Sequence, residues 1–240
     1  MENRDVINKF VRHLQKTYNL LNLKIDCYPD DVNRESPEID AIAGSFAIEH
    51  TSIDTVPHQR RNSDWFMKVI NELEQEFANL PFYLRIAFEY ESITTKQDWV
   101  AIREALKKWI LEKAPRLSVS KPYTPYPVSG IPFKIYVTKG TNPSGSVRFS
   151  RFAPDDHTLS DRIKQLLDKK AKKLTKYKCS GKTTIILVEN NDIALMSTKK
   201  MRQAIRDAYP AGCPATTDKI WYANTSIPEH IDFIDVTPDM

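Results

Sequence analysis

Apolar residues recur at intervals of three and four along several segments, which is the spacing of a helix that buries one face. The first such segment places Val6, Phe10, Leu14 and Tyr18 on one side. Near Asn62 to Asp64, short polar residues that suit a helix N-cap precede another apolar stripe. The pattern predicts helices over Val6 to Tyr18, Asp64 to Phe77, Asp98 to Lys113, Leu159 to Leu174 and Thr198 to Tyr209.

Between these helices lie short runs rich in β-branched and aromatic residues, which favour strands. Thr183 to Val188 is continuously apolar after two threonines, as expected of a central strand buried on both faces. The runs 131–139 and 146–152 suggest a hairpin, preceded by a proline-rich extended connection. The other expected strands are Glu38 to Ala43, Phe46 to Thr51, Phe82 to Tyr90, Lys219 to Ala223 and Ile231 to Val236.

Because strands and helices interleave, the expected class is α/β with a mixed central sheet flanked by helices. The 240 residues fit a single α/β domain covering 1–240, with room for a β-hairpin insertion around 114–155. No apolar run is long enough to cross a membrane, and the first ten residues lack the pattern of a secretory signal. Three widely spaced cysteines offer no disulfide framework and suit a cytoplasmic protein.

The segment Pro37 to Thr51, PEIDAIAGSFAIEHT, predicts a tight hairpin with Gly44-Ser45 at its turn. In that register Asp40 lies directly opposite Glu49. Alternation then places Glu38, Asp40, Glu49 and Thr51 on one face, and leaves a mostly apolar face for the core.

Two carboxylates paired across a hairpin repel each other by roughly 3 kcal/mol at an effective dielectric constant of about 20. A divalent cation reverses the sign of this interaction, and Mg²⁺ (or Mn²⁺) commonly binds one or two carboxylates while keeping waters for chemistry. An exposed hairpin with solvated acids is the alternative. Gln59, Arg60 and Arg61 follow within about ten residues, near a helix start, where an amide and two guanidinium groups suit a phosphate.

An acid on one strand, a short turn, a second acid on the next strand and then a helix resemble the PD-(D/E)xK nuclease superfamily. The stretches IDAIAG, AIEHTSIDT and QRRNSDWF are similar to a group of bacterial proteins with that core. The resemblance implies a restriction-endonuclease-like fold and a metal-dependent phosphodiesterase, with Asp40 and Glu49 as metal ligands and Glu38 as an auxiliary ligand or base.

One position departs from this family. The triplet Glu49-His50-Thr51 places Thr51 where the family has its lysine, and a threonine cannot supply a positive charge. We expect Gln59 to orient water and Arg60 or Arg61 to stabilise charge in its place. His50, on the apolar face, is expected to be a hydrogen-bonded core residue and no metal ligand.

Charge is concentrated in one segment. Between Asp161 and Lys182, nine basic residues face two acidic ones, although the net charge of the chain is only +4. Such a block forms a solvated helix face or a surface for backbone phosphates. On the phosphate interpretation, nucleic acid (DNA more than RNA) would contact Lys169, Lys170, Lys172 and Lys173. The chain is then a nuclease that can act as a homodimer, or an inactive nuclease-fold module that binds nucleic acid or a protein.

Overall fold

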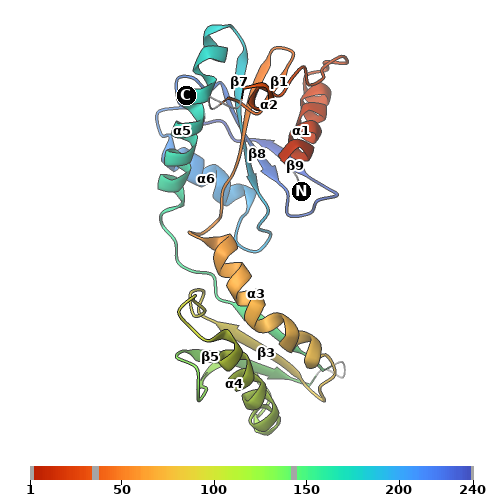
Figure 1. The fold of residues 1–240 in the computed structure, drawn as a ribbon, viewed down its shortest axis with the longest axis vertical. Coiled ribbons are helices and arrows are strands. Elements are labelled where there is room, and N and C mark those ends of the chain that lie inside the picture. The colour runs from red at the N-terminus through yellow and green to blue at the C-terminus, as the bar shows by residue number, and fades with distance from the viewer. Residues whose placement is uncertain (1–2, 34–37, 142–144, 239–240) are drawn as a thin grey trace. The chain divides into compact units, whose positions relative to one another are not determined.

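The computed structural model describes residues 3–33, 38–141 and 145–238 (Figure 1). The chain separates into two compact units. The first combines 1–57 with 156–240, and the second consists of 58–155. This differs from the single domain expected from the sequence, because His58–Asp155 forms a unit that includes more than the anticipated insertion at 114–155.

A five-stranded mixed sheet forms the centre of the first unit, in the order β1-β2-β7-β8-β9. The three inner strands β2, β7 and β8 run parallel, and β1 and β9 are antiparallel edge strands. The strands are β1 (Ala41–Ala43), β2 (Phe46–Ser52), β7 (Thr183–Asn190), β8 (Lys219–Asn224) and β9 (Asp232–Asp235). The predicted α/β class and the central position of β7 are confirmed.

Helices cover both faces of this sheet. On one face, helix α1 (Asn3–Thr17) packs its apolar stripe on side chains of β1, β2, β7 and β8. On the other, α5 (Leu159–Cys179) and α6 (Thr198–Ala208) share a core with alternate residues of the same strands. Figure 1 shows α1 and α5 on opposite sides of the sheet. A short helix α2 (Pro29–Val32), not expected from the sequence, precedes β1.

The β1–β2 hairpin has the register expected from the sequence. Ala43 pairs with Phe46, and Ala41 pairs with Ile48. Gly44 has φ +54°, a conformation that glycine adopts without strain. A shift of the pairing by one residue would move the side chains of a strand to the opposite face of the sheet. The register therefore determines which side chains face α5.

The second unit has its own four-stranded sheet, in the order β4-β5-β3-β6, with a separate apolar core formed with its helices. Its elements are α3 (Gln59–Glu76), β3 (Tyr83–Phe88), α4 (Trp99–Glu112), a 3₁₀ turn η1 (Ala114–Arg116), β4 (Ser120–Pro127), β5 (Lys134–Gly140) and β6 (Val147–Arg151). Asp98 caps α4, its Oδ1 accepting a hydrogen bond from Ala101 N at 3.0 Å.

Three local predictions for this unit are wrong. The strands β5 and β6 do not form a hairpin, because β3 lies between them. The proline-rich connection contains β4, which is an edge strand, the position where missing N–H donors are tolerated. Helix α3 begins at Gln59, five residues before the expected start, after His58 in a left-handed conformation with φ +57°.

Throughout the described ranges, no helix has the length and apolar composition needed to cross a bilayer.

Candidate active site

The two predicted metal ligands lie together at the β1–β2 hairpin. Asp40 immediately precedes β1, and its Oδ2 accepts a hydrogen bond of 2.7 Å from the backbone N of His50. Extending the observed register by one residue places Asp40 opposite Glu49. Glu49 lies in the middle of β2, between β1 and β7 and beneath α5, and its side chain is completely buried.

Positive charge reaches Glu49 from helix α5. The Nζ of Lys170 lies 2.6 Å from Glu49 Oε1, and the Nζ of Lys173 lies 2.9 Å from the same oxygen. Each ammonium also donates to a backbone carbonyl, Lys170 to His50 at 3.3 Å and Lys173 to Glu38 at 2.8 Å. Two lysines are thus fixed beside the buried carboxylate.

The sequence of α5 explains this placement. Its buried residues Leu167, Ala171 and Leu174 repeat at helical spacing and hold the helix on the sheet. Lys170 and Lys173 are three positions apart, so they share one side of the helix at the edge of this stripe. Their aliphatic stems can run along the sheet surface while the ammonium groups reach Glu49.

Burial and the neighbouring Asp40 carboxylate raise the pKa of Glu49 to about 7, while the two lysines act in the opposite direction. Only one of its oxygens is used: Glu49 Oε2 is buried and has no hydrogen-bond partner among the described residues. A buried carboxylate oxygen without a partner is costly. A cation or a hydrogen-bond donor that reaches this oxygen would supply the missing partner.

A divalent cation fits this donor set. One oxygen of Glu49 is unpartnered and the Asp40 carboxylate is close enough to raise the pKa of Glu49. Mg²⁺ often takes only one or two carboxylates and completes its shell with water. Among the described residues there is no cluster of three or more His, Cys, Asp or Glu suited to a metal, so the fit rests on this pair alone.

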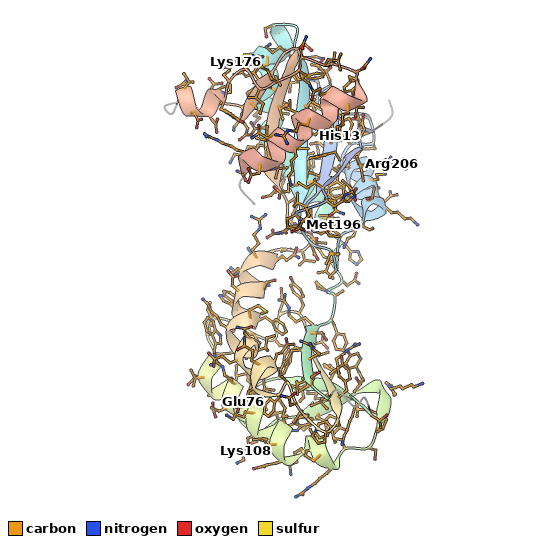
Figure 2. All side chains as sticks on the ribbon, turned by 90° about the vertical axis from the view of Figure 1, so that its right-hand side faces the viewer. His13, Glu76, Lys108, Lys176, Met196 and Arg206 are labelled. Atoms are coloured by element: carbon orange, nitrogen blue, oxygen red, sulfur yellow. The ribbon has the colours of Figure 1, made fainter. Side chains whose placement is uncertain are left out.

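Glu38 is engaged elsewhere. Its carboxylate accepts hydrogen bonds from Lys176 and from the Tyr177 hydroxyl, the latter at 2.9 Å. The Lys176 hydrogen bond, followed by that of Tyr177, lowers the pKa of Glu38. Lys176 is labelled on α5 in Figure 2. Glu38 therefore anchors α5 to the segment that precedes β1, a role that differs from the auxiliary ligand or base expected from the sequence.

The other two residues of the triplet, His50 and Thr51, have different surroundings. Thr51 is buried on β2, at the position where the resemblance would place a lysine. His50 is also buried, and its Nε2 lies 3.0 Å from Glu189 Oε2. The prediction that His50 is a hydrogen-bonded core residue is confirmed.

Gln59, Arg60 and Arg61 open α3 and belong to the second unit. The guanidinium of Arg61 lies over the ring of Trp65, 4.7 Å from its centroid. These three residues belong to the second unit, whereas Asp40, Glu49 and the lysines of α5 belong to the first. Their proposed catalytic and phosphate-binding roles stay predictions.

The lysines of α5 divide into two sets. Lys169 and Lys172 are exposed to solvent, as a phosphate-binding surface requires. Lys170 and Lys173 instead contact Glu49, a role that the sequence analysis did not assign to them. Their position at the border of the apolar stripe was the signal that could have separated them from the exposed pair.

Comparison of the chain with protein-family models, with curated proteins and with solved structures finds no match.

Proposed function

We propose that the chain is a metal-dependent nuclease of restriction-endonuclease-like fold that hydrolyses phosphodiester bonds, DNA in preference to RNA. One observation carries the proposal: a completely buried glutamate, opposite a second acid, keeps one oxygen unpartnered and has two lysines on the other. A carboxylate pair with adjacent ammonium groups is the combination that phosphodiester hydrolysis needs.

The order of elements supports the same proposal. The strand that carries Glu49 is followed, after the second unit, by α5 and then by β7, which pairs with β2 in parallel. The acid-turn-acid hairpin and a helix leading to the neighbouring parallel strand agree with the resemblance to the PD-(D/E)xK superfamily.

In this proposal Asp40 and the unpartnered oxygen of Glu49 would hold Mg²⁺ or Mn²⁺, which would supply an activated water and stabilise negative oxygen atoms. Lys170 takes the place of the motif lysine that Thr51 lacks. Its ammonium lies at the Glu49 carboxylate and can also stabilise negative charge on a phosphate placed there. Lys173 shares this position and ties the segment before β1 to α5.

Nucleic acid would meet the site along α5. Lys169 and Lys172 are exposed on the helix that carries the two inner lysines, so the same element can position a phosphate backbone and stabilise the reacting phosphate. Contacts of this kind hold the backbone without reading its sequence.

A second function, an inactive nuclease-fold module that binds nucleic acid or a protein, is favoured by one observation. Lys170 and Lys173 already neutralise Glu49 within the chain, so the ion pairs could be purely structural. A structural role leaves Glu49 Oε2 without a partner, which disfavours this alternative.

Calorimetric titration with Mn²⁺, combined with a plasmid-nicking assay, tests the proposal. The wild type should bind Mn²⁺ and nick plasmid only with the metal, and Asp40→Asn/Glu49→Gln should lose both properties. The matched control is Glu229→Gln/Asp232→Asn, which removes the same two charges at exposed positions of the first unit.

The outcomes separate the two functions. Metal-dependent nicking by the wild type and the control, but not by the site variant, supports the nuclease. Binding of Mn²⁺ without cleavage of DNA or RNA would favour the inactive module. If the wild type binds no Mn²⁺, or if the site variant nicks as fast as the wild type, the assignment of Asp40 and Glu49 is wrong.

A further inference from the structure

A pocket in the first unit is lined by neither of the hairpin acids Asp40 and Glu49. It has a volume of about 570 Å³, within the range of small-molecule sites. It is formed where the C-terminal end of α5 and the helix α6 meet the loop before β8 and the chain after β9.

Among the charged side chains that line this pocket, four form ion pairs with one another and two arginines do not. Lys178 pairs with Asp218, and Lys219 pairs with Asp235 at 3.2 Å. These four charges therefore balance. Burial, followed by the charge of Asp235, raises the pKa of Cys213 to about 11, so this thiol is neutral at neutral pH and adds no negative charge.

The remaining charges are Arg202 and Arg206, both on α6 and both exposed. No hydrogen bond or ion pair connects either guanidinium to another residue in the described ranges. They are four positions apart, so they lie one turn apart on the same side of the helix. Figure 2 labels Arg206 on this helix. The pocket thus has an excess of two positive charges, carried by groups whose geometry suits phosphate oxygens.

A buried hydroxyl provides a second, independent observation. Thr217 lines the pocket, is only 6% exposed, and its Oγ1 has no hydrogen-bond partner among the described residues. Burying a hydroxyl without a partner disfavours the folded state. Because Thr217 lines the pocket, an acceptor bound there is a candidate partner for this hydroxyl.

We propose that this pocket binds a terminal phosphate monoester, with Arg202 and Arg206 neutralising the dianion and Thr217 donating to one of its oxygens. The volume exceeds that of a phosphate group, and Pro214, Ala215, Val236 and Pro238 supply apolar surface for the rest of the ligand. A free phosphorylated metabolite and the phosphorylated end of a nucleic-acid strand share this chemistry.

The test is calorimetry of the full chain with adenosine 5′-monophosphate, with adenosine as the uncharged probe. The wild type should bind the monophosphate and not adenosine, and affinity should fall as salt rises. Arg202→Gln/Arg206→Gln should weaken binding at least tenfold, because hydrogen bonds to charged groups are lost. The control Arg12→Gln/Lys16→Gln, which removes two exposed charges from α1 on the opposite face of the sheet, should bind as the wild type does.

Thr217→Val keeps the shape of the side chain and removes its hydroxyl. It should fold at least as stably as the wild type, since an unpartnered polar atom is lost, yet bind the monophosphate several-fold more weakly. Unchanged binding in this variant would remove Thr217 from the site, and unchanged binding in the double arginine variant would overturn the proposal.

Short oligonucleotides with a 5′-phosphate or a 5′-hydroxyl distinguish the sources of the phosphate. Tighter binding of the phosphorylated strand than of the mononucleotide, lost in the double arginine variant, identifies the end of a nucleic-acid strand. Equal or weaker binding identifies a free phosphate ester. If neither the mononucleotide nor the phosphorylated strand binds the wild type at millimolar concentration, the pocket is not a phosphate site.

Discussion

Replacing Glu49 by glutamine should remove a specific pH dependence from the stability of the first unit. The pKa of Glu49 is raised from 4.5 to about 7 by burial and by Asp40. A carboxyl group whose pKa is higher in the folded than in the unfolded chain contributes stability that is complete below pH 4.5. That stability is lost as the pH rises through 7, because the unfolded chain then releases its proton first.

The size of the effect follows from the two pKa values. Their difference corresponds to about 3 kcal/mol over the whole titration. Most of this is lost between pH 5 and pH 8, above the usual pKa range of other carboxyl groups. Glu49→Gln has no proton to lose, so the stability of the wild type should fall by about 2 kcal/mol relative to this variant across that range.

Native-state hydrogen exchange of peptides from β2 and β7 is the appropriate assay, since both strands lie at the centre of the first sheet. It reports the opening free energy of this unit without assuming that the two units unfold together. Exchange would be measured at pH 5, 6, 7 and 8, with correction for the intrinsic rate at each pH.

The control is Glu229→Gln, an exposed glutamate of the same unit. Its difference from the wild type should be constant with pH. A constant difference between wild type and Glu49→Gln would show that Glu49 is ionised throughout this range, and that Lys170 and Lys173 outweigh burial. The site would then be a stable internal ion-pair cluster, which favours the inactive module.

Two further predictions concern the lysines of α5. Lys170→Gln removes a charge that lowers the pKa of Glu49. Proton release on Mn²⁺ binding should therefore shift to higher pH, which calorimetry in buffers of different ionisation enthalpy measures. Plasmid nicking should fall at least tenfold. An unchanged nicking rate would exclude Lys170 as the substitute for the motif lysine. Lys169→Glu/Lys172→Glu should weaken DNA binding and reduce the slope of log affinity against log salt by about 2. Fluorescence anisotropy measures both quantities, and Arg12→Glu/Lys16→Glu is the charge-matched control. Equal slopes for the two variants would show that α5 does not contact the phosphates.

The hairpin and its acid pair were predictable because local rules determine them. A Gly-Ser turn between two short strands fixes the register, and alternation then fixes which residues share a face. The order of helices and strands in the first unit followed from apolar periodicity in the same way. Thr183 to Val188 is the simplest case, since a short β-branched run is typical of a central strand, and Thr184 to Val188 are buried in β7.

The contacts of α5 with the hairpin were beyond this reasoning. Lys170 and Glu49 are 121 positions apart, and no local pattern connects them. Helical spacing places Lys170 and Lys173 at the border of the apolar stripe, but only the packing of α5 against β2 shows that these two lysines reach Glu49. The predicted pairing of β5 with β6 was wrong for a related reason. β3, which comes from an earlier part of the chain, lies between these two strands.

The charges at the hairpin give a physical reason to connect the lysines with catalysis. Two carboxylates, Asp40 and Glu49, face two ammonium groups, Lys170 and Lys173, so the ionised site is neutral as it stands. With a divalent cation bound the site would carry two positive charges. A phosphodiester and an attacking hydroxide together bring two negative charges, which this excess would neutralise in a buried position where electrostatic interactions are strong. The same two lysines without a metal leave no excess charge for a substrate, so the nuclease requires the metal, and cleavage by the metal-bound chain distinguishes the nuclease from the inactive module.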